Sequence, residues 1–90
     1  LTYEGNGNYI VRGGASLEEV EGTLGLHLGE QDVTTISGLV VSTLSRVPMA
    51  GEKMTVHGLE VEVLSADRRR IHTLRVRKAM QADAVLQRTQ

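Results

Sequence analysis

Residues 36–63 read ISGLVVSTLSRVPMAGEKMTVHGLEVEV, and the spacing of their apolar side chains changes halfway along. In the first half these side chains recur three and four positions apart, which predicts a helix that buries one face on a sheet. That face comprises Ile36, Leu39, Val40, Thr43, Leu44 and Val47. In the second half apolar and polar residues alternate, which predicts antiparallel strands with one face in water.

Pro48 stands where the two patterns meet. It has no N–H to donate within a helix, and its ring disfavours helical geometry at Val47. We therefore expect Pro48 to end a helix that begins near Thr34 or Thr35. Residues 49–51 should then turn the chain back toward the sheet.

The N-terminal half predicts one strand and one more helix. Residues 1–8 are polar and glycine-rich and predict a frayed lead-in, whereas the β-branched and aromatic residues 9–12 predict a short strand. Ser16 stands three residues before Glu19, the capping-box spacing that opens a helix. The apolar stripe of this helix and its terminating glycine are Leu17, Val20, Leu24 and Gly25.

Three strands are predicted after residue 52. Their inward-facing residues are Met54, Val56, Leu59, Val61, Val63, Leu74 and Val76. The outward-facing Glu60 and Glu62 are expected to face Arg75 and Arg77 across the ladder. Ile71 has the wrong parity for the inward-facing set, which predicts a bulge or a twisted start to the last strand.

These elements predict an α+β fold of order β-α-α-β-β-β, with two helices packed on one face of a small, mainly antiparallel sheet. Ninety residues allow one domain. We place it at residues 9–78, between a flexible lead-in at 1–8 and a tail or weak helix at 79–90.

The composition argues against several classes of protein. A net charge of −1 lacks the basic surplus that nucleic-acid binding by phosphate neutralisation requires. The lack of cysteine excludes a disulfide framework and thiolate metal sites. The sequence shows no signal peptide and no apolar run long enough to cross a bilayer. Because it begins at Leu1 and not at methionine, we expect it to be a fragment of a longer protein.

Few residues carry recognisable chemistry. The three histidines, His27, His57 and His72, have no metal-ligand spacing, although His57 and His72 could approach each other on neighbouring strands. Glu30 and Asp32 lie in an acidic connector, residues 27–34, with no visible catalytic relay. We predict no catalytic, cofactor-binding or metal-binding residue, and hence no enzyme.

A glycine pair and an arginine run can each be interpreted either as an ordinary turn or as a binding site. Gly13-Gly14 could offer N–H groups to an anion, but a turn is favoured because Glu18 and Glu19 repel anions there. The run Arg68-Arg69-Arg70 follows Asp67 and predicts a solvated hairpin tip, with a phosphate or lipid contact as the alternative.

The order and spacing of five motifs resemble the CorC/HlyC transporter-associated domain. The resemblance extends over residues 9–78 and is carried by SLEE at 16–19, TISGLV at 35–40, RVPMAGE at 46–52, GLEVEV at 58–63 and RRIHTLRV at 69–76. It implies a fold similar to the FAD-binding/transporter-associated class, although no FAD-binding motif comes with it. It also implies a position at the C-terminus of a larger protein, after paired CBS domains and often after a membrane domain.

Proteins of this kind are magnesium and cobalt efflux or hemolysin-related proteins. The resemblance therefore implies a non-catalytic regulatory domain on the cytoplasmic side of the inner membrane, which modulates ion transport by docking on a neighbouring domain or subunit. A homodimer is plausible, with the outer face of the sheet or an edge strand at residues 9–12 as the contact. No nucleic acid or cofactor is implied.

Three alternatives remain open at this point. One is a small-ligand sensor that binds a metal ion or nucleotide near the acidic connector and Arg68 to Arg70. Another is the regulatory domain of a cation/proton antiporter. The third is an enzyme fragment whose site is completed elsewhere in the parent chain.

Overall fold

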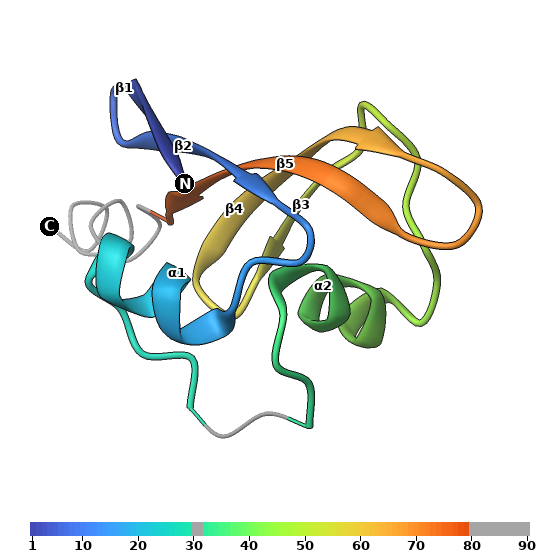
Figure 1. Cartoon of the computed structure of the whole chain (residues 1–90), viewed down its shortest axis with the longest axis horizontal. Coiled ribbons are helices and arrows are strands. Elements are labelled where there is room, and N and C mark those ends of the chain that lie inside the picture. Colours follow the sequence, from blue (N-terminus) through green and yellow to red (C-terminus); the bar gives the residue numbers. More distant parts are fainter. Residues whose placement is uncertain (30–31, 80–90) are drawn as a thin grey trace, which may run out of the picture.

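A computed structural model of the chain describes residues 1–29 and 32–79. Its elements are β1 (Thr2–Gly5), β2 (Asn8–Arg12), α1 (Leu17–Leu24), α2 (Ile36–Leu44), β3 (Lys53–Val56), β4 (Leu59–Ala66) and β5 (Ile71–Lys78). The strands form one antiparallel sheet in the order β1-β2-β5-β4-β3, and both helices lie on one side of it (Figure 1). The predicted α+β class and the packing of two helices on one face are confirmed.

One strand was missed, because the predicted frayed lead-in is wrong for residues 2–5. These residues pair with β2 through a tight turn in which Gly5, Asn6 and Gly7 all have positive φ, at 107°, 56° and 82°. The glycines that suggested disorder are therefore the turn residues of a hairpin. The Tyr3 ring also contacts that of Tyr9, with centroids 5.0 Å apart. The order is thus β-β-α-α-β-β-β, and β2 is an internal strand, not the predicted sheet edge.

Helix α1 begins and ends where its sequence predicts. The Ser16 hydroxyl accepts a hydrogen bond from the Glu19 N–H at 3.1 Å, and Gly25 ends the helix in the left-handed conformation. Leu17 and Val20 are buried and Leu24 is half-buried against the core. The helix therefore packs through the predicted stripe.

Helix α2 begins as predicted but ends three residues earlier than Val47. Thr35 caps its start by accepting from the Gly38 N–H at 3.1 Å. Its end is Leu44, because Ser45 turns left-handed at φ 61° and breaks the helical path. The prediction that Pro48 ends the helix is therefore wrong, and Pro48 lies buried in the following loop. Thr43, predicted on the buried face, is exposed.

The loop from α2 to β3 is organised by one carboxylate. Glu52 accepts two hydrogen bonds from the Arg46 guanidinium, at 2.6 and 2.9 Å, and one from the Met49 N–H at 2.7 Å. The Arg46 guanidinium first, and then the Met49 N–H, lower the pKa of Glu52 from 4.5 to about 2. The Gly51 N–H donates to the Val63 carbonyl at 2.7 Å, so the closed loop is also fixed to β4.

The predicted inward-facing residues of β3, β4 and β5 form the main part of the core. All but the half-buried Met54 are buried, where they pack against buried residues of both helices. The predicted irregularity at the start of β5 is confirmed, because the β4–β5 register shifts between Val63 and Ala66. This shift lets Ile71 and Leu74 both face the core although three positions separate them.

Gly13 is the point where the sheet and the helices are closest. Its N–H donates to the His72 carbonyl of β5 at 2.9 Å, and its carbonyl accepts from the Ser37 N–H of α2 at 2.9 Å. A Cβ atom at this position would lie 2.1 Å from the Ile71 carbonyl oxygen. No side chain fits there without moving the backbone, so the sheet and α2 require glycine.

We predict that Gly13→Ala lowers the free energy of unfolding by about 3 kcal/mol, because the new methyl group must displace the backbone of β5. Gly14→Ala is the matched control, since a Cβ at Gly14 meets nothing within 4 Å. Its effect should stay within about 0.5 kcal/mol. Urea unfolding of both variants checks this, and equal stabilities would refute the close-contact interpretation.

The Glu52 carboxylate predicts a defined pH dependence. Its pKa is lower in the folded chain than its ordinary value of 4.5, so the stabilisation is complete above about pH 5 and is lost as the pH falls toward 2. Glu52→Gln should therefore lower Tm at neutral pH, and the difference from the unmodified chain should shrink between pH 5 and 2. Glu18→Gln, which removes an exposed carboxylate of α1, is the control for the loss of one charge and should leave Tm at neutral pH nearly unchanged.

Candidate docking face

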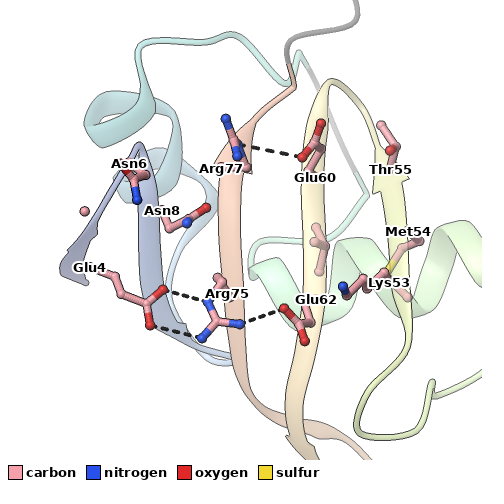
Figure 2. Close-up of a pocket in the computed structure, with 12 residues that line it drawn as sticks. Glu4, Asn6, Asn8, Lys53, Met54, Thr55, Glu60, Glu62, Arg75 and Arg77 are labelled. Carbon is pink, nitrogen blue, oxygen red and sulfur yellow. Dashed lines mark hydrogen bonds and ion pairs between the residues drawn. The ribbon is translucent and has the colours of Figure 1, made fainter.

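The face of the sheet away from the helices carries side chains of alternating charge. We call this surface the charged face, and it comprises Glu4 of β1, Lys53 of β3, Glu60 and Glu62 of β4, and Arg75 and Arg77 of β5 (Figure 2). They share one face because strand residues alternate sides and the antiparallel register places Glu62 opposite Arg75 and Glu60 opposite Arg77. The predicted cross-strand pairs are thus confirmed.

Arg75 connects three strands at the centre of this face. Its guanidinium donates to both carboxylate oxygens of Glu4, at 2.6 and 3.0 Å, and to Glu62 at 2.6 Å. The hydrogen bonds that Arg75 donates to Glu4 first, and then to Glu62, raise the pKa of Arg75, and the Arg75 guanidinium lowers the pKa of Glu4. Arg75 therefore stays charged and holds the β1–β2 hairpin against the rest of the sheet.

Arg77 is bound less completely. Its Nε lies 3.7 Å from Glu60, and within residues 1–29 and 32–79 this buried atom has no hydrogen-bond partner. A hollow of about 670 Å³ extends over the charged face, bordered also by Asn6 and Asn8 of the β1–β2 hairpin (Figure 2). One donor beneath this surface therefore lacks a partner among its described neighbours.

The arrangement suits electrostatic recognition better than catalysis. Three acidic and three basic side chains alternate, and each of the three carboxylates lies against an arginine. In the described part of the chain no group of three histidine or acidic side chains is placed to hold a metal ion. Such a pattern selects a partner with complementary charges more than it adds affinity.

The membership of Glu4 in this surface was not predicted. Its strand was missed, so no outward position was assigned to it. A signal was available, because the alternation of Thr2 and Glu4 with Tyr3 follows a period of two and a glycine-asparagine-glycine turn comes next.

The histidines do not come together. His27 is exposed beyond α1, His57 lies in the β3–β4 turn, and His72 lies on β5, where its Nε2 is 2.8 Å from Asp67. In the register of β4 and β5, Leu59 faces Lys78 at one end and Ala66 faces Ile71 at the other. His57 and His72 are therefore at opposite ends of the ladder, and the possible pairing is wrong.

The proposed ligand site between the acidic connector and the arginine run is not formed by the described residues. The connector between α1 and α2, to which the exposed Asp32 belongs, runs on the helix side of the molecule, whereas the β4–β5 hairpin tip projects from one end of the sheet (Figure 1). Glu30 lies outside the described residues. Gly13 is also unavailable to an anion, because its N–H is already bonded to His72.

No helix among the described residues is long and apolar enough to span a bilayer.

Known proteins of similar sequence point to one family. A family model described as a transporter associated domain, CorC/HlyC, matches residues 2–79. The magnesium and cobalt efflux protein CorC of Salmonella typhimurium is 35% identical over 69 residues, which cover 77% of this chain and 24% of that protein. The chain therefore spans about a quarter of the length of this curated relative.

Two solved structures share the fold. A CorC-associated region from Neisseria meningitidis has a TM-score of 0.79 at 28% identity, over 87% of this chain and 96% of the other. A CorC/HlyC domain from a Xylella fastidiosa hemolysin, described in complex with Mg²⁺ and Mn²⁺, has a TM-score of 0.70 at 28% identity, over 87% and 94%. With the family match over nearly all described residues, these similarities lead to one conclusion: the chain belongs to the CorC/HlyC family of transporter-associated domains.

Proposed function

We propose that this chain is a non-catalytic regulatory domain at the C-terminus of a bacterial magnesium or cobalt efflux protein or a hemolysin-related protein. It modulates ion transport by docking on other parts of its parent, on the cytoplasmic side of the inner membrane. The observation that supports this most strongly is the charged face, which alternates three carboxylates with three cations over four strands and is covered by neither α1 nor α2 (Figures 1 and 2).

The occupant that we propose for the charged face is a neighbouring domain of the same parent. About three quarters of the length of the CorC relatives lies outside the matched region. A parent protein of similar length would therefore contain a covalently linked domain large enough to cover the charged face. A polar surface is sufficient for docking between linked domains, because linkage gives the two surfaces a high effective concentration and the contact needs little intrinsic affinity. The family resemblance suggests CBS domains or a membrane domain as that neighbour.

Pairing of two copies is the second possible docking mode. Strands β1 and β3 form the edges of the sheet and each has only four residues. Short edge strands limit pairing between sheets, which is why we rank this mode second to docking on a neighbouring domain. Tyr3, which is 60% exposed on β1, gives that edge an apolar contact. We therefore propose β1 as the edge for a homodimer, in place of residues 9–12.

A metal sensor is the alternative function. Its support is the Xylella fastidiosa relative, which is described in complex with Mg²⁺ and Mn²⁺. In this chain the carboxylates of the charged face are paired with arginines, and a hard divalent cation would have to displace those guanidinium groups. We therefore favour docking over metal sensing for this surface.

The test expresses the parent protein in bacterial cells whose own cobalt efflux proteins have been deleted. Glu60→Lys replaces the carboxylate beside Arg77 with a fourth cation on the charged face, and like-charge contact should disrupt a complementary interface. Glu18→Lys is the matched control, because it makes the same change in net charge at an exposed position on α1. We expect cobalt efflux to change by about tenfold or more in Glu60→Lys and to stay normal in Glu18→Lys.

Efflux that is normal in both variants would contradict docking through the charged face. Titration of MgCl₂ and CoCl₂ into the 90-residue chain addresses the alternative separately. Saturable heat that Glu60→Gln or Glu62→Gln abolishes would favour the metal sensor, whereas the docking proposal predicts none.

A further inference from the structure

The β4–β5 hairpin ends in three consecutive exposed arginines, Arg68, Arg69 and Arg70, which we call the arginine tip. The Asp67 carboxylate builds the turn, because its Oδ1 accepts from the N–H groups of Arg69 and Arg70 at 2.7 and 3.0 Å. The Asp67 N–H donates to the Arg70 carbonyl at 2.9 Å. The three side chains therefore extend from a turn whose backbone is held in place.

The charge of the arginine tip is not neutralised locally. The Asp67 carboxylate is occupied by the turn N–H groups and by His72, which lower its pKa to about 2. Arg46, Arg75 and Arg77 each form an ion pair with a glutamate. Among the residues that the structure describes, no acidic side chain pairs with any arginine of the tip.

The position of the tip gives it access to an extended surface. It projects at one end of the longest axis of the molecule, which measures 45 Å, and the loop from α2 to β3 lies at the same end (Figure 1). That loop carries Met49, whose side chain is 73% exposed. One end of the domain thus combines three free guanidinium groups with an exposed apolar side chain.

We propose that the arginine tip is a contact site for the surface of an anionic lipid bilayer. Guanidinium groups bind lipid phosphates through paired hydrogen bonds, and basic residues near an anionic leaflet are attracted to its negative potential. Met49 supplies an apolar side chain that can enter the interfacial region. The inference goes beyond the proposed function and does not rest on it, because bilayer binding is a property of this chain alone.

A bilayer fits these features better than a nucleic acid does. The two tyrosines lie on β1 and β2, away from the tip, so no tyrosine stands beside the arginines to stack on bases. The ring of His72, near the tip, is hydrogen-bonded to the Asp67 carboxylate. The chain as a whole carries a net charge of −1, which disfavours wrapping by a long polyanion. A flat bilayer would touch only the tip. Salt at physiological concentration screens charges over about 8 Å, so the acidic side chains in the rest of the domain would repel the bilayer only weakly.

The test measures binding of the 90-residue chain to vesicles by co-sedimentation at about 0.15 M salt. Vesicles of phosphatidylcholine alone are compared with vesicles that contain about 30% phosphatidylglycerol. The variant Arg68→Gln/Arg69→Gln/Arg70→Gln should bind the anionic vesicles on the order of 100-fold more weakly, about fivefold for each arginine. On vesicles of phosphatidylcholine alone, the unmodified chain and this variant should bind equally weakly.

The matched control is Arg12→Gln/Lys53→Gln/Lys78→Gln, which removes the same charge from three exposed positions elsewhere. It should retain most of the binding, and so should the triple lysine variant of the tip, which keeps its charge. Thermal unfolding of each variant confirms that the fold is intact, and a tip variant that unfolds is replaced by Arg69→Gln, with an expected fivefold loss.

Four results would overturn the proposal. Equal loss of binding in the tip and control variants would mean that the vesicles attract the positive charges of the chain in general. Equal binding to anionic and neutral vesicles would exclude a site for anionic lipid. Displacement by inorganic phosphate beyond that by sodium chloride of equal ionic strength would indicate a free-phosphate site. Tip-dependent binding to duplex DNA that is tighter than binding to vesicles would assign the tip to nucleic acid.

Discussion

The contact between the backbone of Gly13 and the Ile71 carbonyl is the constraint on which the architecture depends. At this point the end of β2, the start of β5 and the first turn of α2 meet through two backbone hydrogen bonds of Gly13. A further bond of 3.0 Å from the Ile36 N–H to the Ala15 carbonyl ties the start of α2 to the segment before α1. Both helices are thereby fixed to the same side of the sheet.

The functional surfaces follow from this placement. Because both helices cover one face, the opposite face is left to water and carries alternating charges. Arg75 joins β1 to β4 across that face, so ion pairs connect the strands of the charged face. The arginine tip lies at one end of the sheet, away from the middle of the charged face (Figure 1). A domain with two such surfaces can touch a neighbouring domain and a bilayer together.

Periodicity and capping predicted most of the fold because they report directly on burial. The alternation from Met54 to Val76 and the caps at Ser16 and Thr35 are local signals, and the structure confirms them. The end of α2 was misplaced because Ser45 adopts a left-handed conformation that its residue type does not favour. Strand β1 was missed because glycine and asparagine suit a tight hairpin turn as well as a frayed end.

The candidate site was only partly predictable for a related reason. The pairs of Glu60 and Glu62 with arginines follow from register, which the strand pattern sets. The role of Glu4 depends on pairing between the first strands and the last, 71 residues away, which no local pattern reports. The function itself came from resemblance, since docking surfaces carry no motif comparable to a catalytic or phosphate-binding loop.

Carboxylate footprinting of the parent protein tests the central claim, that the charged face is covered in the intact protein. A carboxyl-modifying reagent and mass spectrometry would compare labelling rates at each glutamate in the 90-residue chain and in the parent. The account predicts slower labelling of Glu60 and Glu62 in the parent, with Glu18 and Glu19 of α1 unchanged. Unchanged labelling on the charged face together with protection of α1 would show that the helices, and not the sheet, form the docking surface.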